Sequence, residues 1–173
     1  MTLLRGLGIT VLVVAAVVLQ TAVLSQVAID GVVPDLALVL VVAAALVRGP
    51  ELGAATGFVA GLAIDLAPPA DHVAGRWALA LVIVGYLAGR LRYDAASPVS
   101  SVLAVGAGSF VGTSVFALSG LLLHDRVAPV PEMLQVIALS VFLDIIIAPL
   151  LLPPLLALFR RLRPPRVAQG VLP

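Results

Sequence analysis

The stretch that decides the fold is Met133–Phe159, MLQVIALSVFLDIIIAPLLLPPLLALF, which holds 27 residues and one charged side chain, Asp144. A helix of about 20 apolar residues crosses the hydrocarbon core of a bilayer. Two uncharged runs elsewhere in the chain, Gly6–Ile29 and Ala95–Leu123, are also long enough to cross it. The chain is therefore expected to be an integral membrane protein.

The composition of the 173 residues leads to the same expectation. Hydrophobic residues make up 62% of the chain and charged residues 11%, whereas a soluble domain has about 45–50% and about 25%. These numbers exclude a disordered chain and a nucleic-acid-binding protein. The chain has no cysteine, which excludes a disulfide framework and a thiolate site.

Three shorter apolar blocks lie between the long ones: Leu36–Val47, Leu52–Ile64 and Trp77–Gly89. Alone, each could be a re-entrant or interfacial segment, but each can span if its flanking charged residues reach the headgroups. Proline, which suits the first position of a helix, stands at four of the expected starts. The sequence thus predicts an all-α, polytopic membrane bundle of about six transmembrane helices. The helices are expected near residues 7–29, 34–48, 50–67, 75–91, 98–123 and 132–152.

The arginines predict the orientation of these helices. With six spans and a cytoplasmic N-terminus, eight of the ten basic residues fall in inner segments, and only Arg76 and Arg126 fall in outer loops. This distribution follows the positive-inside rule. We expect a multi-pass protein of the cell membrane with both termini in the cytoplasm. Residues 1–159 would form the transmembrane bundle, and residues 160–173 a basic, proline-containing cytoplasmic tail.

Glycine recurs every four residues in the third expected helix, at Gly53, Gly57 and Gly61. This spacing keeps the glycines on one helix face, where small residues let a second helix approach closely. Two interpretations stay open: packing inside this chain, or docking of another protein's transmembrane helix. The docking candidates are Gly53, Gly57, Gly61, Asp65, Gly85 and Gly89.

Asp144 is the one acid that must lie deep in the bilayer, where an aspartate costs about 2.5–3.5 kcal/mol on insertion scales. It should face the interior of the bundle, with Ser109, Thr113 and Ser114 as candidate partners. The residue is either a buried polar tie between helices or a group used in proton coupling or ligand contact.

Asp35 and Asp65 are both expected near the outer face. Asp35 begins the second helix, where the helix dipole favours an acid. Asp65 ends the third helix, where the dipole disfavours one, so it needs a partner, and Arg76 is the nearest candidate.

No catalytic constellation is found in the sequence. His72 and His124 fall in different outer loops and lack the spacing of a metal site. No acid–base pair can be assembled. The expectation is a protein that is not an enzyme and that uses no metal or cofactor.

Several short stretches together resemble a known family. They are Val33–Leu40, Leu46–Pro50, Gly53–Leu66, Ala80–Leu91, and Ala148–Leu150 leading into Arg160–Leu162. In order and spacing they are similar to MreD, the rod shape-determining membrane protein. The sequence departs from the family at residues 68–72, which lengthen an outer loop, and at Asp144, where the family often has asparagine.

The resemblance implies a non-enzymatic scaffold or adaptor of the cell-elongation machinery, which serves peptidoglycan synthesis. It implies a single-span, coiled-coil partner of the MreC type. It also implies indirect links to a RodA-type glycosyltransferase, a penicillin-binding transpeptidase and MreB filaments. Family members are similar in fold to the substrate-binding subunits of energy-coupling-factor vitamin transporters. Such a transporter subunit is therefore the alternative function, and Asp35, Asp65, His72 and Trp77 could line its ligand site.

Overall fold

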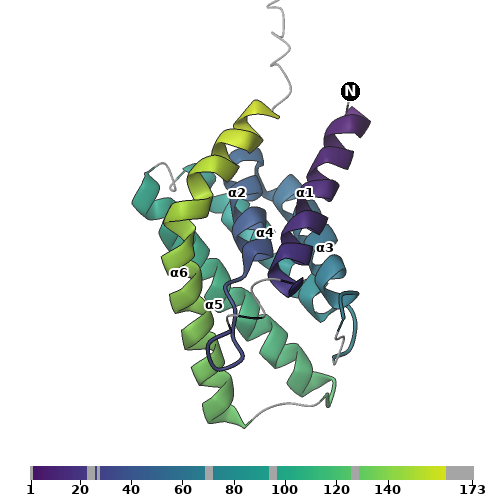
Figure 1. The fold of residues 1–173 in the computed structure, drawn as a ribbon, viewed down its shortest axis with the longest axis vertical. Coiled ribbons are helices and arrows are strands. Elements are labelled where there is room, and N and C mark those ends of the chain that lie inside the picture. Colours follow the sequence, from purple (N-terminus) through teal and green to yellow (C-terminus); the bar gives the residue numbers. More distant parts are fainter. Residues whose placement is uncertain are drawn as a thin grey trace, which may run out of the picture.

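The computed structural model describes residues 2–22, 26, 28–68, 72–93, 97–125 and 129–162. These residues form six α-helices and one short 3-10 helix, and no strand is found among them (Figure 1). The all-helical expectation is confirmed for this part of the chain. The elements are α1 (Thr2–Ala22), α2 (Leu36–Arg48), α3 (Pro50–Asp65), α4 (Arg76–Arg90), η2 (Leu91–Tyr93), α5 (Pro98–Leu122) and α6 (Val130–Arg161).

Most helix starts agree with the sequence signals, but two helix ends do not. Proline opens α3 at Pro50 and α5 at Pro98, and Ser97 caps α5 in a capping box with Ser100. The first helix was expected to reach residue 29, yet α1 ends at Ala22. The last was expected to end near residue 152, yet α6 continues through its internal prolines to Arg161. A membrane helix tolerates proline because neighbouring groups satisfy the freed backbone atoms.

The bundle is built around α2. Every residue of this helix from Leu36 to Val47 is buried, because α1, α3, α4, α5 and α6 all contact it. The helices α3 and α4 form the closest pair, and α5 packs against α6. The start of α1 and the end of α6 lie at the same end of the bundle, whereas the end of α5 and the start of α6 extend beyond the other helices at the opposite end (Figure 1).

Two of the described helices are long and apolar enough to cross a membrane, namely α5 with 25 residues and α6 with 32. At about 1.5 Å per residue, α6 is about 48 Å long, which exceeds the about 30 Å of a hydrocarbon core. Gly6–Ala22 and α2 are shorter apolar helices. By length and composition, two of the described helices could thus span a membrane, fewer than the six expected.

Candidate functional site

The glycines of α3 and α4 form a contact that we call the glycine seam: Gly53, Gly57, Gly61, Gly85 and Gly89. All five are buried. A Cβ atom added to Gly57 would overlap the backbone of Leu81, and one added to Gly61 would overlap that of Ala78. The two backbones are thus in direct contact, which accounts for the spacing by packing inside the chain. Docking of a partner through these glycines is not tested by this geometry.

Asp65 caps the beginning of α4 from the end of α3. Its Oδ2 accepts hydrogen bonds from the backbone N–H groups of Gly75 at 2.8 Å and Ala78 at 3.1 Å, and its Oδ1 accepts one from Trp77 at 3.1 Å. The Nδ1 atom of His72 lies 3.7 Å from Oδ1. Asp65 therefore sits at the positive end of the α4 dipole, which favours an acid.

Arg76, the partner expected for Asp65, pairs with Asp125 instead. Its Nη1 donates to Asp125 at 2.6 Å, its Nη2 donates to the carbonyl of Phe116 at 2.7 Å, and its Nε donates to Ser119 at 3.3 Å. The guanidinium carbon also lies 3.9 Å from the centre of the Phe116 ring. The side chain is buried and ties the start of α4 to the end of α5.

Asp144 lies inside the bundle and bonds to the start of α2. Its Oδ1 accepts a hydrogen bond from the backbone N–H of Asp35 at 2.6 Å, while Asp35 caps α2 by accepting from Leu38 at 2.9 Å. Ser109 of α5, one of the partners expected from the sequence, is also buried and lies beside Asp144. Asp144 thus joins α6 to α2. This contact agrees with the first of the two interpretations of Asp144, a buried polar tie between helices.

A pocket of about 320 Å³, the carboxylate pocket, opens beside this tie. Asp35, Asp144 and Gln20 line it together with Trp77 and Phe116, whose rings stack with their centres 4.5 Å apart. Gln20 accepts a hydrogen bond from the N–H of Ala37 at 3.2 Å. Asp35 and Trp77 therefore share one pocket, whereas Asp65 and His72 are not among its lining residues.

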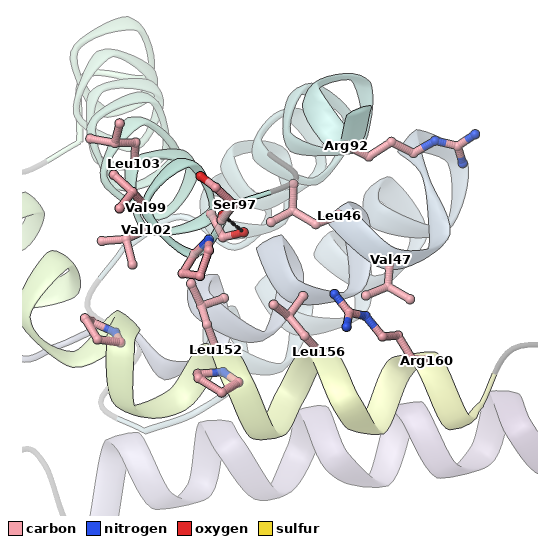
Figure 2. Close-up of a pocket in the computed structure, with 14 residues that line it drawn as sticks. Leu46, Val47, Arg92, Ser97, Val99, Val102, Leu103, Leu152, Leu156 and Arg160 are labelled. Atoms are coloured by element: carbon pink, nitrogen blue, oxygen red, sulfur yellow. Dashed lines mark hydrogen bonds between the residues drawn. The ribbon is translucent and has the colours of Figure 1, made fainter. Parts of the chain in front are cut away.

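A larger cavity of about 750 Å³ lies between α2, the start of α5 and the second half of α6. We call it the arginine groove, because Arg92 and Arg160 line it (Figure 2). Its walls are mainly apolar, with Leu46 from α2, Val99 from α5, and Leu152 and Leu156 from α6. Ser97, the cap of α5, is also part of the lining.

A family model described as rod shape-determining protein MreD matches residues 1–162 of the chain. The chain belongs to the MreD family. No curated protein and no solved structure gives a match. Membership of the MreD family makes the chain a membrane protein connected with rod shape, and it confirms the resemblance seen in the sequence.

Sequence reasoning about this MreD family member missed the arginine groove and the role of Gln20. Gln20 could have been noticed as one of the two amide side chains, with Gln26, in an uncharged apolar run. The groove had a weaker signal, the three internal prolines of α6 together with Arg92 of η2 and Arg160 at the end of α6. No group of three or more His, Cys, Asp or Glu side chains that could hold a metal occurs among the described residues.

Proposed function

We propose that this chain is a non-enzymatic scaffold of the cell-elongation machinery, where it serves peptidoglycan synthesis by holding a single-span partner of the MreC type in the membrane. The observation that carries the proposal is the family match, which covers residues 1–162 and so includes every described residue. The partner would then link this chain to the RodA-type glycosyltransferase, the penicillin-binding transpeptidase and the MreB filaments.

The use of the buried polar groups supports a scaffold. Asp65 caps α4, Arg76 joins α4 to α5, and Asp144 joins α6 to α2. These contacts hold helices in place, and in an apolar interior such groups need partners of this kind. These three groups thus have structural roles between helices of the described part of the chain, as expected of a scaffold.

We also propose six spans in the cell membrane, with both termini in the cytoplasm. The start of α1 and the end of α6 lie at the same end of the bundle (Figure 1). At that end Arg48 of α2 donates to the carbonyl of Leu162 at 3.0 Å, and Arg92 packs against Gly49 in the turn between α2 and α3. A basic end supports a cytoplasmic location.

The partner helix, in this proposal, docks on the side of α3 that faces away from the glycine seam. Ala55, Phe58 and Leu62 are exposed there, and their spacing of three and four residues forms one stripe along the helix. Phe58 is 53% exposed and would be the central anchor. The seam glycines would then act indirectly. They would fix α3 against α4, so that the exposed stripe keeps its position on the bundle.

A crosslinking experiment tests the proposal. A photoreactive residue is placed at Phe58 and, as a control on another exposed surface, at Leu118 of α5. The protein is irradiated in its native membrane, purified in mild detergent, and its adducts are identified by mass spectrometry. A single-span coiled-coil protein captured at Phe58 but not at Leu118 supports the scaffold and the docking stripe.

Two other results would overturn parts of the proposal. Capture at Leu118 alone would move the docking surface to α5. Copurification of a transmembrane coupling subunit with a pair of ATPases, in place of wall-synthesis proteins, would favour the transporter alternative.

A further inference from the structure

The arginine groove combines an apolar interior with a positively charged end. Leu152 and Leu156 of α6 point toward the cavity in Figure 2, and Val99 of α5 also lines it. Among the lining residues that the structure describes, no side chain is acidic. A ligand that fits both features has an apolar body and a negatively charged group at one end.

The charged end is formed by three elements that come from different parts of the chain. Arg160 extends from the last turn of α6 and is exposed, and Arg92 of η2 also lines the groove, with its guanidinium pointing outward in Figure 2. The beginning of α5, at Ser97 and Pro98, also lines the groove, and the start of a helix carries a partial positive charge. Arginine is well suited to phosphate because its planar guanidinium can donate two parallel hydrogen bonds.

We propose that the arginine groove binds one anionic phospholipid of the cytoplasmic leaflet. The phosphate lies at Arg160 and the start of α5, Arg92 adds a further positive charge near it, and an acyl chain runs along Leu152 and Leu156. The inference rests on the orientation proposed above, in which this end of the bundle is cytoplasmic. Basic pockets between membrane helices on that side are suited to anionic headgroups.

Lipid retention by the purified full-length chain tests this site. The protein is exchanged into detergent micelles that contain equal amounts of phosphatidylglycerol and phosphatidylcholine with the same acyl chains, and bound lipid is counted by native mass spectrometry. We expect phosphatidylglycerol to be retained in preference. Arg160→Gln should weaken its retention about fivefold, the effect of one basic residue near an anionic surface. Arg92→Gln should act in the same direction.

Arg90→Gln is the matched control. Arg90 is exposed at the end of α4, donates to the hydroxyl of Tyr86 at 3.3 Å, and does not line the groove. Leu156→Trp is a second variant, which should block the acyl chain and lower the retention of phosphatidylglycerol while every arginine remains.

Equal retention of the two lipids would overturn the proposal. So would an equal effect of Arg90→Gln and Arg160→Gln, since that result would indicate general surface attraction. Unchanged retention in Leu156→Trp would also overturn it. Because the assay contains no partner protein, its outcome is independent of whether a single-span partner binds.

Discussion

At the scale of single residues, Asp144 shows how the structure uses an acid that is 1% exposed. The sequence predicted hydroxyl partners on α5, yet the described hydrogen bond comes from the backbone of Asp35. Sequence reasoning paired side chains with side chains and gave no information about which backbone N–H groups are free. The N–H of Asp35 is free because Asp35 precedes the first turn of α2.

We therefore predict that Asp144→Leu destabilises the protein more than Asp144→Asn does. Asparagine keeps an oxygen that can accept from the N–H of Asp35, whereas leucine leaves that buried donor without a partner, at a cost of about 1–3 kcal/mol. The measurement is thermal unfolding of the purified variants in detergent. Equal midpoints for the two variants would show that the tie to α2 contributes nothing.

Asp65 gives a second prediction at this scale. Asp65→Ala removes the acceptor of three N–H groups at the start of α4, and loss of a helix cap costs about 0.5–2 kcal/mol. Asp65→Asn keeps one acceptor oxygen and should lose less. Hydrogen exchange at residues 75–78 checks the assignment, because the loss of protection should concentrate there in Asp65→Ala.

The sequence identified Asp65 as an acid in need of a partner but named the wrong one. Arg76 is eleven positions away and has the opposite charge, which makes it the obvious candidate along the chain. In the fold, N–H groups at the start of α4 donate to Asp65, whereas the side chain of Arg76 extends toward Asp125 and donates to it. A helix terminus is an electrostatic partner too, and its position depends on tertiary structure.

At the scale of helices, the glycine seam was visible in the sequence, but its partner was not. A spacing of four residues predicts close approach of some second helix. It does not distinguish a helix of the same chain from one of another protein. The structure places α4 against this face of α3.

Neighbouring residues on opposite sides of α3 allow these roles to be separated. Gly57→Leu should lower the amount of folded protein, because the new side chain would overlap the backbone of Leu81 and force the two helices apart. Overpacking of this kind costs about 1–3 kcal/mol or more. Phe58→Ala removes an exposed side chain and should leave the protein level unchanged while partner recovery falls.

Protein level in membranes and partner recovery per molecule are the two measurements. If Gly57→Leu lowered partner recovery while protein level stayed normal, the seam would itself be the docking surface. A normal partner yield in Phe58→Ala would remove the stripe on α3 from consideration.

The predicted end of α6, near residue 152, is wrong. Pro149, Pro153 and Pro154 each remove a backbone donor, and in water such a run ends a helix. Here the helix continues to Arg161, since an apolar surround penalises any backbone that leaves its helical hydrogen bonds. The extension also carries Leu156 and Arg160 to the arginine groove, so the groove could not be found from a helix that stopped near residue 152.

At the scale of the whole molecule, apolar blocks and flanking charges predicted which segments are helices, but not which helix lies at the centre. Nothing in the composition of α2 requires burial on all sides, because lipid and protein interior select the same residue types. Its central position comes from the small residues of its neighbours: the glycines of α5, Gly108 and Gly112, lie close to Leu38 of α2 and Val84 of α4.

The last prediction follows from the proposed orientation. It is simple to test because the chain has no cysteine. Single cysteines are introduced at Val73 and Val130, in the two outer segments, and at Leu91, in an inner one; all three positions are exposed. A membrane-impermeant maleimide should label positions 73 and 130 in intact cells, or in spheroplasts where an outer membrane is present, and position 91 only after lysis. The physical reason is the arginine distribution, which retains basic segments in the cytoplasm. Labelling of position 91 in intact cells would invert the bundle, place the arginine groove in the outer leaflet, and remove the basis for an anionic lipid there.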